Sequence, residues 1–178
     1  MTQGRITPLA AWLAFGLMFA ANPTEGQERK AGLYAGYTFL KADNGNLSGL
    51  RVSPEYRLNR LAALVGDLSA EKGTFSASDT TLISYLFGVR LKFGTGSRRV
   101  FVHGLFGGAH VSASARSGNV TFSDAASGLG LDGGGGIEFT LNRAFRMRVG
   151  ADYLRRRVKA PGIVLIANDV RATVGFVV

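Results

Sequence analysis

A histidine, a serine and a glutamate on neighbouring segments raise the question of hydrolytic catalysis. His110 and Ser112 are two residues apart, and Glu138 follows in the next alternating segment. In a hydrolytic triad the histidine takes the serine proton and the carboxylate orients the imidazole, so the three side chains must converge. In an antiparallel hairpin His110 and Glu138 would lie near opposite ends, roughly 15 Å or more apart at about 3.4 Å per residue. We therefore predict no catalytic residues.

Metal, cofactor and phosphate sites have little support. The chain has no cysteine and only two histidines, which excludes thiolate ligands, disulfides and a cysteine nucleophile. His103 shares a face with Phe101 and Leu105, which predicts a place at a lipid–water boundary. The run Gly133–Gly136 precedes no Lys-Ser/Thr pair and no helix, so it indicates a strand bend or a close backbone approach. We predict no metal and no cofactor.

The basic residues outnumber the acidic ones, 21 to 12, and give a net charge of +9. The densest basic run falls near the end of a predicted strand, and we take Arg155, Arg156, Arg157 and Lys159 as candidates for contact with lipopolysaccharide phosphates. A solvated loop explains this run equally well. Most other basic residues alternate with apolar ones or lie in tight links, so nucleic-acid binding is not expected.

The elements that position these residues follow from a period of two. In Ile83–Phe93, every second residue is apolar, while the intervening ones include Ser84, Arg90 and Lys92. Such alternation is typical of a strand with one apolar and one polar face. Eight strands fit, at about 32–42, 48–58, 61–72, 80–93, 99–114, 128–141, 144–157 and 166–178.

The links between these strands alternate in length. Those at 59–60, 95–98 and 142–143 are short, whereas 43–47, 73–79, 115–127 and 158–165 are longer and polar. In an up-and-down barrel alternate links lie at the same end, and one short-turn end with one long-loop end is typical of outer-membrane barrels. The sequence therefore predicts an all-β fold, an eight-stranded antiparallel up-and-down transmembrane β-barrel.

The polar faces are predicted to point inward. They carry small residues and charges of both signs, and the chain has 25 glycines in 178 residues, which suits the crowded interior of an eight-stranded barrel. Unpaired charges there would cost several kcal/mol each, so we expect them to pair. The predicted lumen charges are Arg51, Glu55, Arg57, Asp67, Glu71, Arg90, Asp132, Glu138, Arg146, Arg148, Asp152 and Arg171.

Aromatic residues on the apolar faces predict two lipid–water belts. The belt near the short turns would contain Tyr56, Phe93, Phe101, Phe139, Phe145 and Phe176, and the other would contain Tyr85 and Tyr153.

The N-terminus has the pattern of a secretory signal peptide. Arg5 precedes the apolar stretch Leu9–Ala21, and a polar segment follows at 22–27. The stretch is shorter than the about 20 residues of a spanning helix. We predict a signal peptide at 1–21, a short lead at 22–31 and a barrel at 32–178, hence export through the periplasm to the outer membrane.

After the signal peptide the chain resembles the small outer-membrane β-barrel family, the OmpA/OmpX-like eight-stranded barrels. The residues that carry the resemblance are Ala35–Leu40, Glu55–Leu61, Gly133–Arg143 and Arg146–Leu154, and two of these segments contain an Asn-Arg turn. The resemblance implies an outer-membrane location, contact with outer-membrane lipid and lipopolysaccharide, and transit with periplasmic chaperones and the barrel-assembly machinery. Family members often end in an aromatic residue, whereas this chain ends Phe176-Val-Val.

The predicted role is non-enzymatic: envelope structure, surface interaction through long extracellular loops, or a narrow porin-like passage. One alternative is a hydrolase resembling the outer-membrane lipid A deacylases, which requires His110, Ser112 and Glu138 to converge. A soluble periplasmic ligand-binding barrel with its apolar face inside is the second alternative.

Overall fold

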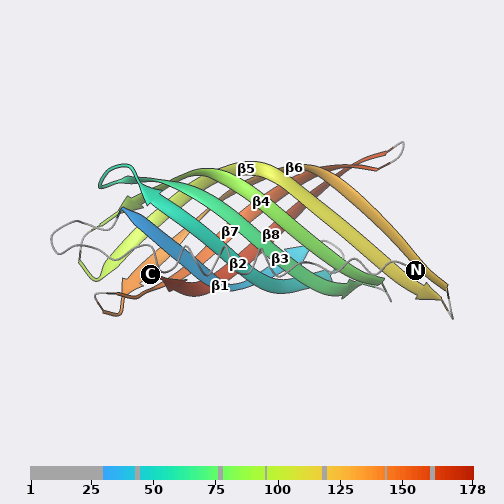
Figure 1. Ribbon diagram of the computed structural model, residues 1–178, viewed down its shortest axis with the longest axis horizontal. Helices are drawn as coiled ribbons and strands as arrows, with labels where there is room; N and C mark the ends of the chain where they lie inside the picture. The colour runs from blue at the N-terminus through green and yellow to red at the C-terminus, as the bar shows by residue number, and fades with distance from the viewer. Residues whose placement is uncertain are drawn as a thin grey trace.

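Eight antiparallel strands close into one barrel (Figure 1). The computed structural model describes residues 30–42, 45–75, 78–94, 96–117, 120–142, 144–160 and 163–178. The predicted signal peptide and nearly all of the predicted lead lie outside the described residues. The strands are β1 (Ala31–Ala42), β2 (Gly45–Arg57), β3 (Ala62–Phe75), β4 (Ser78–Phe93), β5 (Arg98–Ser117), β6 (Val120–Thr140), β7 (Arg146–Ala160) and β8 (Ile163–Val177).

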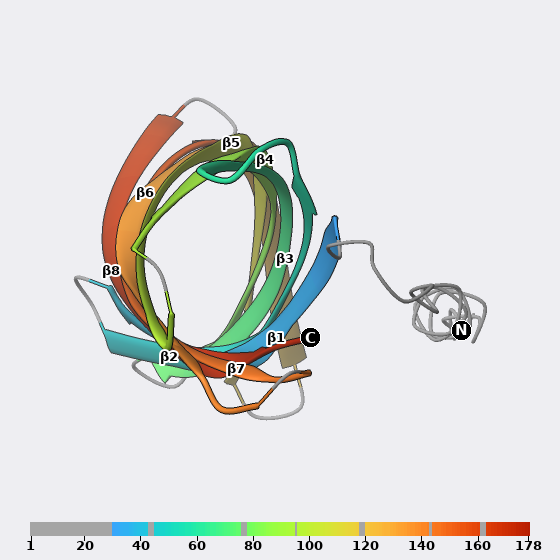
Figure 2. The same cartoon turned by 90° about the vertical axis from the view of Figure 1, so that its left-hand side faces the viewer.

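Each strand pairs with the next in the chain, and β8 returns to pair with β1. The closing ladder runs from Tyr34 opposite Val177 to Lys41 opposite Val170. Figure 2 looks along the barrel and shows the unbroken wall. The predicted fold class and topology are confirmed.

The links at 58–61, 94–97 and 141–145 define what we call the turn end. The side-chain oxygens of Asn59 and Asn142 each accept hydrogen bonds of 2.8 Å from the backbone N–H groups two and three residues later. An asparagine that bonds its own backbone in this way stabilises a turn, which explains the two Asn-Arg turns. The remaining turn contains Gly94 and Gly96, whose φ angles of 96° and 80° favour glycine.

We call the opposite end of the barrel the far end. The prediction of long polar loops at this end is wrong. The segment predicted as a loop at 115–127 continues as strand, with pairs up to Ser117 opposite Val120. Strands similarly occupy most of 43–47, 73–79 and 158–165. Outside the membrane a strand needs no apolar face, and serine, threonine and aspartate can form its backbone hydrogen-bond ladder. The strand therefore continues after the alternation of apolar and polar residues has ended. β5 and β6, at 20 and 21 residues, are the longest strands and extend far to the lower right in Figure 1.

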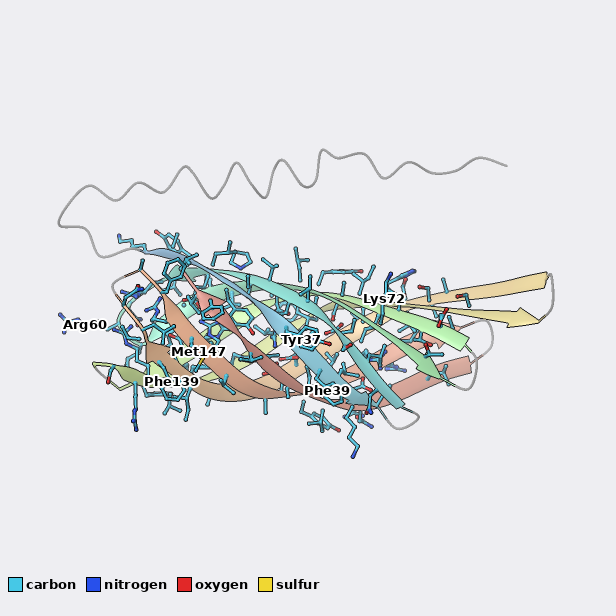
Figure 3. The ribbon with its side chains drawn as sticks, turned by 90° about the horizontal axis from the view of Figure 1, so that it is seen from below. Tyr37, Phe39, Arg60, Lys72, Phe139 and Met147 are labelled. Carbon is cyan, nitrogen blue, oxygen red and sulfur yellow. The ribbon has the colours of Figure 1, made fainter. Side chains whose placement is uncertain are left out.

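Apolar side chains cover the outside of the barrel and charged ones fill much of the inside. On β4, Phe87 is 54% exposed whereas its neighbour Leu86 is 3% exposed, and the same alternation follows the other strands. Figure 3 shows Tyr37 and Phe39 on the outside of β1 and Arg60 beyond the turn end. This inside-polar arrangement suits a barrel whose solvent is lipid.

On β5 the predicted faces are wrong. Phe101, His103 and Leu105 are buried in the lumen instead of facing a lipid boundary. Val102 and Phe106 on the other face are also apolar, so hydropathy gave no contrast between the faces. The register decides, because His103 lies opposite the buried Arg90 of β4. Phe101 therefore does not belong to the aromatic belt predicted near the short turns.

The lumen also contains an apolar cluster, which differs from the expectation of a wholly polar interior. Its members are Leu40, Leu47, Val65, Leu82, Leu86, Leu105, Ala109 and Leu154. Several of these residues lie near the far-end boundaries of β1, β2 and β4, so this cluster fills the interior toward the far end.

Candidate functional site

Three cations in the lumen near the turn end contact the same carboxylate. Glu55 accepts hydrogen bonds from Arg90 Nη1 at 2.8 Å, Lys92 Nζ at 2.5 Å and Arg148 Nη2 at 2.9 Å. Glu138 accepts from Arg148 Nε at 2.9 Å, and Lys92 Nζ lies 3.4 Å from Glu138 Oε1. Because all five side chains are buried or half-buried, each cation depends on these two carboxylates for its compensation.

Two aromatic rings pack against the same guanidinium groups. Arg148 lies 4.9 Å from the ring centroid of Tyr34 and 5.2 Å from that of Phe101, and Arg90 lies 5.2 Å from Phe101. These are cation–π distances. An inward Cβ at Gly136 would lie 2.9 Å from Phe101 Cζ, so glycine at this position leaves room for the ring.

A second set of charges lies farther into the barrel. Arg51 Nε donates to Asp67 Oδ2 at 2.6 Å and Arg51 Nη1 pairs with Asp152 across the lumen. Ser53 Oγ donates to the same Asp67 oxygen at 2.5 Å. Arg51 thus ties β2 to its neighbour β3 and to β7 on the other side.

Arg171 is fully buried and bridges three strands. It pairs with Asp132, lies 3.3 Å from Glu71 Oε1 and 3.6 Å from Asp152 Oδ2, and donates to Ser69 Oγ at 3.1 Å. A single guanidinium therefore links β8 to β3, β6 and β7 through their acidic side chains.

His103 joins this second set through two carboxylates. Its Nε2 lies 2.9 Å from Asp132 Oδ1 and 3.2 Å from Asp152 Oδ1. These three residues have the ligand types of a metal site, with donor atoms within 4.8 Å of one another. The other carboxylate oxygens already pair with Arg171 and Arg51, so the negative charges of both aspartates are compensated by protein cations without a metal ion. The arrangement favours a structural ion-pair network.

The structure places most of the predicted lumen charges inside the barrel. Arg57 and Arg146 are only partly buried and lie near the turn end. Lys92 and Asp169 are further inner charges, and they share the inward faces of Arg90 and Arg171 by simple alternation, a signal available in the sequence. Ten of the twelve predicted residues are buried: Arg51, Glu55, Asp67, Glu71, Arg90, Asp132, Glu138, Arg148, Asp152 and Arg171.

The residues of the hydrolase alternative do not converge. His110 lies opposite the outward-facing Ile83, and its Nδ1 is 2.8 Å from Ser127 Oγ. Glu138 points into the lumen. His110 lies opposite Ser127 of β6, and Ser127 and Glu138 are 11 residues apart on that strand, or about 37 Å at 3.4 Å per residue. The side chain of His110 is on the outer face of the barrel, so the wall also separates it from Glu138.

The basic run near the end of β7 divides between the two faces of the strand. Arg155 and Arg157 point outward, whereas Arg156 is buried and its Nε donates to Asp169 at 2.7 Å. The lipopolysaccharide contact expected of Arg156 does not fit this inward position. The side chain of Lys159 lies outside the described residues. Strand geometry continues through Ala160, so alternation separates residues that a loop would have presented together.

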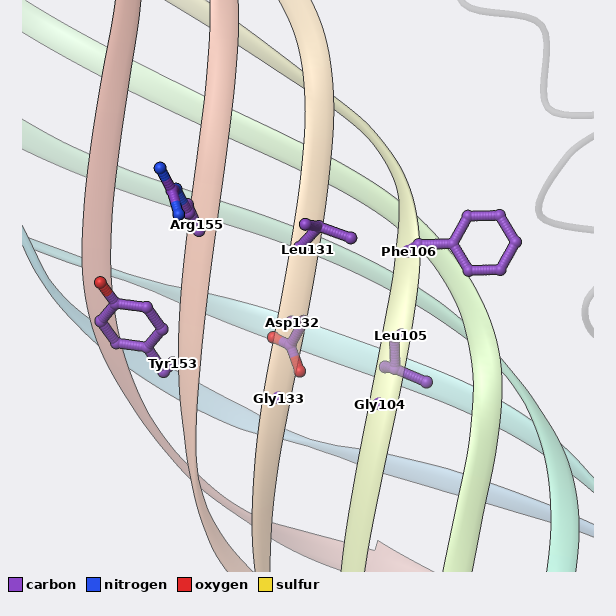
Figure 4. A pocket seen from close by; sticks show the side chains of 8 residues that line it. All are labelled: Gly104, Leu105, Phe106, Leu131, Asp132, Gly133, Tyr153 and Arg155. Carbon is purple, nitrogen blue, oxygen red and sulfur yellow. The ribbon is translucent and has the colours of Figure 1, made fainter.

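A groove of about 480 Å³ lies on the outer wall where β5, β6 and β7 run side by side (Figure 4). In one register row Gly104 lies opposite Gly133, which lies opposite Tyr153; in the next row Phe106, Leu131 and Arg155 are paired in the same way. The glycines form the hollow and the larger side chains border it. Asp132 and Leu105 point inward, so their backbone belongs to the floor. The groove is lined by Gly104, Leu105, Phe106, Leu131, Asp132, Gly133, Tyr153 and Arg155.

A closed eight-stranded meander with an apolar exterior and an ion-paired interior defines the class of small transmembrane β-barrels. Residues 10–176 match the family described as the outer membrane protein beta-barrel domain, and the chain belongs to this family. The protein is located in the outer membrane, which excludes the soluble periplasmic barrel. No curated protein matches the chain by sequence. Among the described residues, no helix is long and apolar enough to cross a membrane.

Solved structures share this fold at low sequence identity. The attachment invasion locus protein Ail of Yersinia pestis is 18% identical with a TM-score of 0.61, and the match covers 85% of this chain and 100% of Ail. Neisserial surface protein A is 18% identical with a TM-score of 0.63, covering 83% and 94%. The N-terminal barrel of OprF from Pseudomonas aeruginosa is 16% identical with a TM-score of 0.53, covering 85% and 100%.

Proposed function

We propose that this protein is a non-enzymatic outer-membrane barrel with a sealed lumen that acts through its outer surface. The observation that carries the proposal is the filled interior. Cross-lumen ion pairs such as Arg51–Asp152 and Arg171–Glu71 connect strands that are three apart in the closed wall. The inner apolar cluster occupies the space toward the far end. A passage would require both to rearrange, because eight strands enclose little more than their own side chains.

Two outer features support action at the surface. The β5–β6 hairpin extends beyond its neighbours, since β4 ends its pairing opposite Ala115 and β7 opposite Ser127. The outward side chains of Arg155 and Arg157 support a contact with lipopolysaccharide phosphates, and Lys159 follows them on the same strand. A structure of Ail contains the heparin analogue sucrose octasulfate, and this relative at 17% identity with a TM-score of 0.59 is a precedent for ligand binding in the fold. On its way to the membrane the chain would be carried by periplasmic chaperones to the barrel-assembly machinery.

Conductance in planar bilayers tests the sealed lumen. The full chain is expressed in a Gram-negative host, recovered from the outer membrane, checked for heat-modifiable migration and reconstituted. We expect no steady channel from the wild type, and none from Leu68→Ala, which removes an outward side chain that is 57% exposed. Arg171→Ala, which removes a cross-lumen cation, is expected to give transient openings. Steady conductance of the wild type in most insertions would refute the sealed-lumen proposal.

A further inference from the structure

The groove between β5, β6 and β7 contains two glycines that the fold itself does not require. An added Cβ at Gly104 or at Gly133 would meet no atom within 4 Å. Neither residue has a positive φ angle; among the described glycines only Gly45, Gly94 and Gly96 do. By contrast, a Cβ at the adjacent inward Gly134 would lie 2.3 Å from Asp152 Oδ1. Glycine in a strand interior weakens the strand and often marks a bend or a site of close approach. Since no described atom of the chain comes near a Cβ at Gly104 or Gly133, that approach would come from outside the chain.

The walls of the groove are suited to hydrocarbon. Phe106, Leu131 and Tyr153 are each more than half exposed and border the hollow left by the glycines. In Figure 4, Tyr153 and Arg155 flank the groove on one side and Phe106 lies on the other, with Leu131 between them. A volume of about 480 Å³ lies within the roughly 300–1,000 Å³ range of small-molecule sites. Since the outer wall faces lipid, the occupant is an acyl chain.

Arg155 supplies the positive charge that would select a lipid with a negatively charged headgroup. It is exposed, and no acidic side chain in the described part of the chain forms an ion pair with it. It follows Phe145, at the turn end, by ten residues. Ten residues span about 33 Å along a strand, or about 25 Å along the membrane normal at a tilt of about 40°, which matches the height of the apolar band. Arg155 therefore lies at the opposite membrane surface from the turn end, at the depth of headgroup phosphates.

We infer that the groove is a binding site for one lipopolysaccharide molecule of the outer leaflet, with an acyl chain over Gly104 and Gly133 and a lipid A phosphate on Arg155. Short turns of outer-membrane barrels face the periplasm, which puts Arg155 in the outer leaflet, where lipopolysaccharide is the phosphate-bearing lipid. The inference rests on the proposed lipopolysaccharide contact and adds the site and the part of the lipid that each residue holds.

Native mass spectrometry of the full chain, processed and purified from the outer membrane of a Gram-negative host, tests the site. The protein is delipidated and titrated with bisphosphorylated lipid A, dephosphorylated lipid A and phosphatidylglycerol. Gly133→Leu fills the hollow, and its control, Ala70→Leu, places the same side chain at an outward position on β3. Arg155→Gln removes the phosphate contact, and its control is Lys72→Gln, which removes an exposed positive charge near the far end of β3 and does not line the groove.

For the wild type we expect bisphosphorylated lipid A to bind at least ten-fold better than phosphatidylglycerol. Gly133→Leu should lower that binding about ten-fold, and Arg155→Gln should abolish the preference for the phosphorylated form. The two controls should stay within two-fold of the wild type. Unchanged binding to a folded Gly133→Leu protein overturns the groove, as does an equal loss in Ala70→Leu. Equal binding of phosphatidylglycerol overturns the choice of lipopolysaccharide.

If Gly133→Leu does not reach the heat-modifiable folded form, Gly104→Ala replaces it, with a smaller expected loss of about three-fold. Conductance tests the sealed-lumen proposal, whereas lipid A binding tests this site. A failure of one can therefore be distinguished from a failure of the other.

Discussion

Glu55 accepts hydrogen bonds from three cations in the lumen, and its replacement by glutamine should strongly destabilise the barrel. It accepts hydrogen bonds from Arg90, Lys92 and Arg148, and the three distances are 2.9 Å or less. Removing one partner of a buried ion pair costs about 3–5 kcal/mol, because the remaining charge stays buried without compensation. With three cations affected, and Glu138 still able to compensate two of them, we expect Glu55→Gln to lower the free energy of unfolding by about 4 kcal/mol.

A double-mutant cycle separates this electrostatic effect from lost packing. Arg90→Met breaks the contact with Glu55 but leaves that carboxylate with two other cations, so we expect a loss of about 2 kcal/mol. In the double variant the uncompensated Arg90 is absent. The double variant should therefore lose less free energy of unfolding than the sum of the two single losses, by about 1–2 kcal/mol. An exposed acid on β4 provides the control: Asp79→Asn should change the free energy of unfolding by less than about 0.5 kcal/mol.

The assay is reversible urea unfolding in phospholipid vesicles, followed by heat-modifiable gel migration. The reasoning is refuted if Glu55→Gln loses less than about 1 kcal/mol or behaves like the Asp79→Asn control. It is also refuted if the single losses of Glu55→Gln and Arg90→Met are strictly additive, since the cations would then not depend on Glu55.

Three further predictions use the same unfolding measurement. His103→Leu should lose at least about 2 kcal/mol because one oxygen of each of two buried carboxylates loses its histidine partner, whereas a residue at a lipid boundary would lose little. Gly133→Ala should be neutral or stabilising by up to about 1 kcal/mol, while Gly175→Ala should cost about 1–3 kcal/mol because its Cβ would lie 2.3 Å from a backbone oxygen of β1. Asn59→Ala should lose about 1 kcal/mol with its two turn hydrogen bonds, and the exposed Arg60→Ala should change stability by less than about 0.5 kcal/mol.

Sequence reasoning succeeds on the strands that have a contrast between their faces. On β4 the alternation from Ile83 to Phe93 separates lipid-facing from lumen-facing side chains, and the structure has the same division. On β5 both faces are apolar near Phe101, so hydropathy cannot choose between them. At the far end the polar residues of 115–127 resemble a loop because the membrane no longer imposes an apolar face.

The sequence by itself determines the strand count, the barrel class and most of the charges that enter the lumen, because a period of two is a local property of the chain. The tertiary structure alone decides which charges meet. Arg171 reaches Glu71 across 100 positions in the sequence, and His103 lies between two aspartates from different strands. The groove at Gly104 and Gly133 is likewise a product of register, since two small residues leave a hollow only when adjacent strands place them side by side.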